Sequence, residues 1–148
     1  MNQLSSKNKT TLPFSSSGIW NIITDINSYP EWWPTSVKIK VLDLSDNLIG
    51  SVIKIKPYGG LGFNCEISEA VENKRLILKY SGIYSGTGIW NIIEGSGMST
   101  VTYEINLKIE SLFIRMLSVF LPIDKIHFNL MNDVLSALQN RLKNRTLK

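Results

Sequence analysis

The fold is decided by two stretches near the end of the chain: STVTYEINLKI at residues 99–109 and DKIHFNLMNDVLSALQNRLK at residues 124–143. From Thr100 onward the apolar and polar residues of the first stretch alternate, which predicts a strand with one buried face and one face in water. The second stretch contains neither glycine nor proline, and its apolar residues recur at intervals of three and four. This spacing predicts a long amphipathic helix.

The stripe of the helix that faces the sheet follows from the same spacing. It consists of Phe120, Asp124, His127, Met131, Val134, Leu138 and Leu142. The apolar run at residues 112–121 predicts a separate short helix, and Pro122 marks a break or kink after it. We therefore expect Asp124 and His127 to lie on the side of the long helix that faces the sheet.

Five more segments, upstream of these two, are predicted to be strands. Turn-forming residues separate them, and their ranges are 38–44, 50–56, 62–71, 75–81 and 86–94. Residues 1–12 predict a further strand, although most of them are polar. The hydroxyls of residues 15–17 are suited to capping a helix over residues 16–26. Pro30 predicts one more short helical turn before Pro34.

The order of these elements indicates one architecture. Strands that are joined by tight turns are antiparallel neighbours. The sequence therefore predicts an α+β fold, in which a curved antiparallel sheet of six to seven strands grips one long C-terminal helix, with two short helices after the first strand. One helix is too thin to fill such a curl, so we expect a cavity between helix and sheet, and apolar cavities bind small molecules.

Composition limits the remaining function classes. The chain has 148 residues, 43% hydrophobic and 19% charged, which predicts a single globular domain over residues 1–148. Cys65 is the only cysteine and His127 the only histidine, which excludes an internal disulfide framework and a multi-histidine metal centre. Cys65 lies in an apolar strand and is predicted to be a buried, inert thiol. We predict no metal and no other cofactor.

The charge pattern does not favour nucleic acid. The net charge is +4, but lysine and arginine are scattered, apart from a C-terminal run of Arg141, Lys143, Arg145 and Lys148. These cations suit the negative end of the helix dipole, and a weak contact with anionic lipid headgroups is the alternative. The start of the chain lacks the apolar segment of a signal peptide, and no apolar run is long enough to span a membrane. We therefore expect a cytoplasmic protein.

Several stretches in order resemble one superfamily. They are IWNIITD at residues 19–25 with YPEWWP at 29–34, IGS at 49–51, GIYSGTGIW at 82–90, STVTY at 99–103, and the helix positions His127, Met131, Leu138 and Leu142. Over residues 12–142 the chain resembles the SRPBCC or START-like (helix-grip) superfamily, in its polyketide cyclase/dehydrase and lipid-transport group. The resemblance implies a cavity for a hydrophobic ligand. It does not imply one reaction, because the superfamily includes both carriers and enzymes.

His127 and Asp124 are the candidate catalytic residues. A neutral imidazole both donates and accepts a hydrogen bond, and a carboxylate three residues earlier on a helix lies at contact distance. Asp124 would then hold the imidazole in one tautomer. The alternatives are a structural histidine in the core and an acid placed at a helix N-terminus, where it is stabilising.

The candidate ligand-binding residues are mostly aromatic. They are Trp32, Tyr80, Tyr84, Trp90, Tyr103, Arg115, His127 and Met131. Tyr80 and Tyr103 share faces with apolar strand residues and are predicted to point inward, whereas the direction of Trp90 stays open because Ile89 and Ile93 compete with it. Trp32 and Trp33 cannot both be buried on one face of a short turn, so one of them is expected at the mouth of the cavity.

Three functions remain open. The first is binding of a small hydrophobic molecule, such as a lipid, a quinone, or an aromatic or polyketide-like metabolite. The second is a polyketide cyclase or dehydratase reaction with His127 as acid or base. The third is docking through an exposed apolar lid at residues 112–121 onto a membrane or a protein. Whether the chain is a monomer or a homodimer is not determined by the sequence. Arg115, within that lid, either extends to solvent or lies at the entrance for an acidic ligand.

Overall fold

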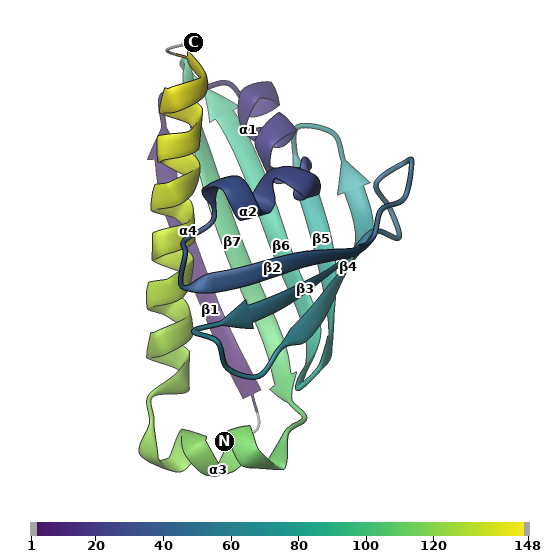
Figure 1. The fold of residues 1–148 in the computed structure, drawn as a ribbon. Helices are drawn as coiled ribbons and strands as arrows, with labels where there is room; N and C mark the ends of the chain where they lie inside the picture. The colour runs from purple at the N-terminus through teal and green to yellow at the C-terminus, as the bar shows by residue number, and fades with distance from the viewer. Residues whose placement is uncertain (1–2, 147–148) are drawn as a thin grey trace.

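The computed structural model describes residues 3–146, and in them one curved antiparallel sheet of seven strands packs against a long helix (Figure 1). The strands are β1 (Gln3–Leu12), β2 (Val37–Asp43), β3 (Val52–Pro57), β4 (Phe63–Val71), β5 (Arg75–Gly82), β6 (Tyr84–Gly95) and β7 (Met98–Ile109). The helices are α1 (Ser16–Ile23), the 3₁₀ turn η1 (Ile26–Ser28), α2 (Tyr29–Trp32), α3 (Leu112–Phe120) and α4 (Ile123–Thr146). The α+β fold predicted from the sequence is confirmed.

Neighbouring strands in the sheet are also neighbours in sequence, except at one edge. The order is β1-β7-β6-β5-β4-β3-β2, so β2 through β7 form a meander and β1 closes it beside β7. The predicted first strand is confirmed from Gln3 onward, and residues 1–2 lie outside the described residues. Its polar composition is tolerated because β1 is an edge strand. Leu4 and Leu12 bury its ends, and Asn8 lies between them on the same face.

Asn8 joins this edge strand to the long helix. Its side chain is buried, and its Nδ2 donates to the carbonyl oxygen of Phe128 at 2.9 Å and to Oδ1 of Asn132 at 2.8 Å. A buried amide that makes these two bonds fixes the position of the helix along the strand, because an unpaired buried donor is costly. The sequence pattern did not single out this residue.

The two short helices that follow β1 pack against the sheet: α1 contacts β6, and α2 contacts β2 (Figure 1). Ser15 caps α1 by accepting from the Gly18 backbone N–H, as the cluster of serines predicted. The predicted helix over residues 16–26 is wrong in its extent, because α1 ends at Ile23 and a 3₁₀ turn follows. Pro30 lies in the first turn of α2, where its missing N–H leaves no bond unmade.

Pro122 separates two helices, as predicted. Because of this break, the prediction is wrong for one residue of the stripe. His127, Met131, Val134, Leu138 and Leu142 are buried against the sheet. Phe120, however, belongs to α3 rather than α4, and its side chain is 83% exposed. The helical spacing could not continue through the break, because α3 crosses the end of the sheet while α4 runs along it (Figure 1).

Candidate functional site

An apolar pocket lies where α3 and the first turns of α4 meet the sheet. Its volume is about 180 Å³. The lining residues come from four places in the chain, namely Pro57, Tyr58, Gly60, Leu61, Phe63, Ile83, Tyr84, Ile114, Ile123, Ile126, His127 and Leu130. An engineered apolar cavity of about 150 Å³ in another protein holds benzene, so this pocket has room for one small ring.

His127 contributes an imidazole to this lining, which also contains the rings of Tyr58 and Tyr84. His127 lies on the first turns of α4, its side chain is 8% exposed, and its Nδ1 has no hydrogen-bond partner among the described residues. Burial lowers the pKa of the imidazole from 6.5 to about 4, because desolvation disfavours the charged form. At neutral pH the ring is therefore uncharged, with one nitrogen that donates and one that accepts.

Asp124 does not hold the imidazole in this structure. Its Oδ1 also lacks a partner, and no hydrogen bond joins Asp124 to His127 within residues 3–146. The expected orientation of the ring by this carboxylate is therefore not seen, although both residues are on the predicted turn of the helix. Helical spacing brings two residues close, but the direction of the side chains decides whether they bond.

Of the aromatic candidates, Tyr84 lines the pocket, and Tyr80, Tyr103 and Trp90 lie behind it in the core. Phe63 stacks on Tyr80 at 5.3 Å between ring centroids and contacts Tyr84 edge-on at 5.3 Å. The Tyr80 and Tyr103 hydroxyls are hydrogen-bonded to each other, and Trp90 packs on Tyr103 at 4.8 Å. These five rings form a continuous row that begins at the pocket wall.

The row is buried, and within it the hydroxyls of Tyr80 and Tyr103 are hydrogen-bonded to each other. Burial raises the pKa of Tyr80 and of Tyr103 well above the usual range, and it also raises that of Tyr84. The predicted inward direction of Tyr80 and Tyr103 is confirmed, and Trp90, whose direction the sequence left open, faces inward as well. A Cβ at Gly88 would lie 2.5 Å from the Tyr103 hydroxyl oxygen, so this glycine makes room for the pair.

The remaining candidates lie away from the pocket lining. Trp32 is buried and Trp33 half-buried, and both pack around Tyr29 with centroid distances of 5.5 and 5.3 Å. The expectation that one tryptophan lies at the mouth is not met by this pocket. Arg115 is half-buried and its Nε donates to the Ile109 carbonyl oxygen at 2.8 Å. Met131 is buried in the core between α4 and the sheet.

The lining residues that sequence reasoning missed are aliphatic. Ile83, Ile114, Ile123, Ile126 and Leu130 supply much of the wall. The last three come from α4 and could have been found from the sequence, because the first turns of this helix carry apolar residues around His127. The other two lie in a turn and on the short helix, whose placement depends on long-range contacts.

Three further observations concern the cysteine, possible metal ligands and the helices. Cys65 is fully buried, and burial raises the pKa of its thiol, as expected for an inert cysteine. In the part of the chain that the structure describes, no three histidine, cysteine or acidic side chains gather closely enough to hold a metal ion. No helix among residues 3–146 is long and apolar enough to cross a membrane.

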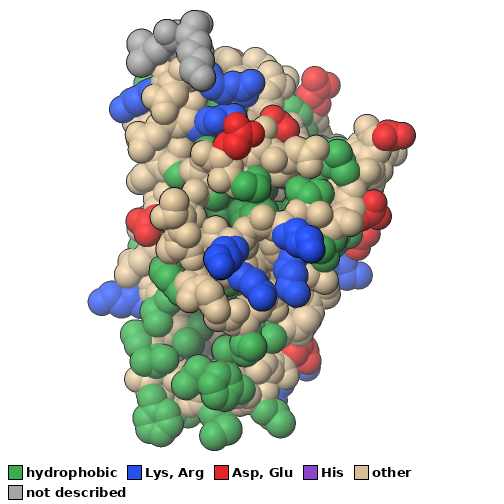
Figure 2. All heavy atoms as spheres, viewed as in Figure 1, with side chains coloured by type: hydrophobic (Ala, Val, Ile, Leu, Met, Phe, Trp, Pro, Cys, Tyr) green, Lys and Arg blue, Asp and Glu red, His purple; other side chains and the backbone are tan. Residues whose placement is uncertain are grey.

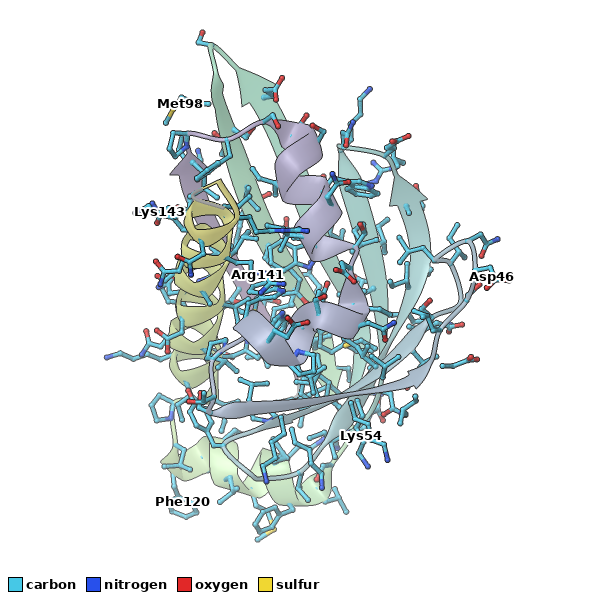
Figure 3. All side chains as sticks on the ribbon, turned by 45° about the horizontal axis from the view of Figure 1, so that its top comes forward. Asp46, Lys54, Met98, Phe120, Arg141 and Lys143 are labelled. Atoms are coloured by element: carbon cyan, nitrogen blue, oxygen red, sulfur yellow. The ribbon has the colours of Figure 1, made fainter. Side chains whose placement is uncertain are left out.

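The basic C-terminal run lies far from the pocket. Arg141 reaches toward α2, where its guanidinium lies 3.6 Å from the Glu31 carboxylate (Figure 3). The run occupies the last turns of α4, at the opposite end of the molecule from α3 (Figure 1), and Lys148 lies outside the described residues.

Comparisons with known proteins place this fold. Among solved structures the chain is similar to a START superfamily protein from Mycobacterium smegmatis, with a TM-score of 0.73, 14% identity, and coverage of 95% of this chain and 97% of that one. It is similar to the di-domain ARO/CYC StfQ from the steffimycin biosynthetic pathway, with a TM-score of 0.75 and 9% identity. That match covers 99% of this chain and 53% of StfQ, so this chain spans about half of its length.

A third similar structure is a point mutant of norcoclaurine synthase from Thalictrum flavum in complex with a transition-state analogue. Its TM-score is 0.68 at 9% identity, with 97% of this chain and 96% of that one covered. At such identities the likeness shows the fold alone. A search of the curated proteins finds no match. The profile of the family described as "Polyketide cyclase / dehydrase and lipid transport" matches residues 12–132. This protein therefore belongs to the polyketide cyclase/dehydrase and lipid-transport family.

Proposed function

We propose that this protein binds a small hydrophobic molecule in the pocket between α3, α4 and the sheet. The observation that carries the proposal is an unpaired, buried imidazole nitrogen, His127 Nδ1, in a lining that is otherwise almost wholly apolar. A buried polar atom without a partner is costly, so a ligand that supplies one is favoured. The part of the ligand that enters the pocket is thus apolar and about the size of one ring, and it carries a substituent that forms a hydrogen bond.

The size of the pocket separates the ligand classes. A single aromatic ring or one end of a lipid or quinone fits about 180 Å³, whereas a folded polyketide chain needs α3 to move outward. Because α3 contributes Ile114 to the pocket and buries no residue fully, it is the element whose displacement would disturb the core least. Small ligands are therefore the better fit to the pocket as it stands.

A cyclase or dehydratase reaction is the alternative, and the similarity in fold to the ARO/CYC protein StfQ supports it. It is supported less well because acid–base catalysis needs a second group beside His127. Asp124 makes no bond to the imidazole, and the hydroxyls of Tyr80 and Tyr103 are bonded to each other. This leaves the Tyr84 hydroxyl, which lines the same pocket and whose pKa is raised by burial, as the second group such a reaction would use. If the protein is such an enzyme, His127→Gln abolishes turnover while the substrate still binds.

The first experiment is mass spectrometry of the purified protein under native and denaturing conditions, with an organic extract analysed in parallel. We expect an excess mass in the native spectrum that disappears on denaturation and whose source is recovered in the extract. A ligand that is strongly charged and has no apolar part would contradict the proposal, since the pocket offers no cation to receive it.

Filling the pocket should remove binding. We expect indole, a small ring compound with one N–H donor, to raise the unfolding temperature of the wild-type protein, because a ligand that binds only the folded state stabilises it. Ile114→Trp places a larger side chain into the pocket from α3, and we expect it to weaken indole binding by at least about tenfold.

The matched control is Met116→Trp, which adds the same ring to the same helix on a side chain that is 66% exposed. Isothermal titration of wild type and both variants measures the effect. Equal affinity in all three proteins would place the binding site elsewhere.

A further inference from the structure

Helix α3 leaves most of its apolar residues exposed, although Ile114 and Leu117 are half-buried. Its side chains Leu112, Phe113, Met116, Val119 and Phe120 are between 59% and 83% exposed. Arg115 and Ser118 are half-buried instead: Nε of Arg115 donates to the Ile109 carbonyl oxygen at the end of β7, and the Ser118 hydroxyl donates within the helix to the Arg115 carbonyl oxygen at 2.6 Å. A helix on the surface of a protein normally buries its apolar face. The outer face of α3 is therefore built to be covered.

The exposed apolar surface continues beyond the helix. Leu121 follows α3, and Tyr58 and Leu61 from the β3–β4 loop line the same pocket as Ile114 of α3 and are themselves exposed. Figure 2 shows these apolar side chains gathered at one end of the molecule, here named the apolar end. Contiguous apolar patches of this kind mark interaction sites.

Four lysines lie beside the apolar end. Lys38 and Lys40 of β2 are direct cross-strand partners of Lys56 and Lys54 of β3, so two pairs of like charges face each other on the outer face of the sheet. None of the four, here named the lysine quartet, forms an ion pair with any described residue. Like charges directly opposite each other destabilise a sheet. Lysine on an edge strand prevents aggregation, which accounts for β2, but β3 is an inner strand.

The quartet and the apolar end adjoin each other. A Cβ built at Gly62 would lie 2.9 Å from Cγ of Lys56 and 3.0 Å from Cε of Lys54, so both lysine stems pass over the chain next to Leu61. In Figure 2 a group of blue side chains lies above the green apolar end on the same face, and in Figure 3 Lys54 and Phe120 both lie in the lower part of the view, Phe120 on α3 and Lys54 to its right.

We propose that this end of the protein docks on the surface of a membrane that contains anionic lipids. The apolar end would enter the boundary between headgroups and acyl chains, as amphipathic helices do, while the lysine quartet contacts the headgroup phosphates. A bilayer is the partner that supplies an apolar layer and, immediately above it, a layer of negative charge. The same two layers, in the same order, are present on this face of the protein. The inference is independent of what the pocket binds.

Flotation of the full chain with lipid vesicles tests the proposal. We expect binding to vesicles of phosphatidylcholine mixed with phosphatidylglycerol, weaker binding to pure phosphatidylcholine, and a decrease as salt is added, because salt screens the lysine–phosphate attraction. Equal binding to both vesicle types, or to neither, would overturn it.

Two pairs of variants locate the contact. Phe113→Ser with Phe120→Ser should weaken vesicle binding at least about tenfold, since each ring loses its burial in the bilayer. Ile93→Ser is the control, because Ile93 is 71% exposed near the far end of β6.

Lys38→Glu with Lys40→Glu should weaken binding at least about twentyfold, each cation near an anionic surface contributing about fivefold. Lys9→Glu with Lys74→Glu changes the net charge equally at exposed positions outside the quartet and should have little effect.

The lysine variant also separates docking from a purely structural role. Replacing Lys38 and Lys40 by glutamate puts opposite charges across from Lys56 and Lys54, so the unfolding temperature should rise while vesicle binding falls. If the lysine variant loses both folding and vesicle binding, the stabilising effect expected of it is wrong. Vesicle binding by the α3 variant then decides whether the proposal holds. A dimer that the α3 variant dissociates, without vesicle binding, would overturn the proposal in favour of a second copy of the chain. Binding to duplex DNA in place of vesicles would overturn it as well.

Discussion

Gly86→Ala is expected to destabilise the protein by about 3–5 kcal/mol, the range in which a substitution has a specific steric cause. A Cβ at this position would lie 2.2 Å from the carbonyl oxygen of Asn106 on β7, and the backbone φ of Gly86 is +137°, which side chains rarely adopt. The clash is with backbone, so no side-chain rotation relieves it. Strand β6 would have to separate from β7 at the end where Tyr84 enters the pocket.

Urea denaturation of the purified variant measures this loss. Gly95→Ala is the matched control on the same strand, because a Cβ there meets nothing within 4 Å and its φ is not in the left-handed region. We expect the control to change the free energy of unfolding by less than about 1 kcal/mol. A similar, small effect of both substitutions would mean that β6 and β7 separate more easily than their pairing suggests.

His127 is expected to make the stability of the protein fall as the pH falls from about 6.5 to about 4. The unfolded chain takes up a proton on this residue near pH 6.5, whereas burial lowers the pKa in the folded protein to about 4. Between these values the unfolded state binds more protons, so acid favours unfolding. The accumulated loss is about 3 kcal/mol and reaches its limit below the lower pKa.

The test compares the wild-type protein with His127→Gln, which does not titrate. Carboxylates contribute alike to both proteins, so the difference between their free energies of unfolding isolates the imidazole. We expect the stability of the wild type relative to the variant to decrease by about 3 kcal/mol from pH 7 to pH 4. If the difference stays constant with pH, the imidazole is not desolvated in the folded protein. A ligand that donates a hydrogen bond to His127 Nδ1 favours the neutral ring and should steepen the dependence.

The sequence was sufficient for the elements that repeat a simple period. Strands β5 and β7 alternate apolar and polar residues, and the stripe from His127 to Leu142 follows helical spacing, so the inward faces of Tyr80, Tyr103 and this stripe could be predicted correctly. On β6 the direction of Trp90 stayed open. The order of the strands also followed, because short turns leave antiparallel neighbours as the only arrangement. Strand β1 was predicted in place despite its polar residues, and its buried Asn8, bonded to α4, could not be recognised from alternation alone.

The site depended more on tertiary structure. Sequence reasoning selected His127 and Tyr84, which line the pocket, but also Trp32, Trp90 and Met131, which lie in the core. Inward-facing aromatic residues look alike in sequence whether they fill the interior or surround a space. What distinguishes them is how far the neighbouring rings fill the curl of the sheet.

By itself, then, the sequence determined the fold class, the direction of most strand residues and the position of the one histidine on the long helix. Each of these depends on interactions between residues that are close in sequence, or on the periodic burial of one face. Tertiary structure alone decided that Phe120 faces solvent on a separate helix, that Asp124 makes no bond to His127, and that four lysines face each other beside an apolar end. These features arise where distant segments meet, and the register and angles of that meeting are set by the packing of the whole chain.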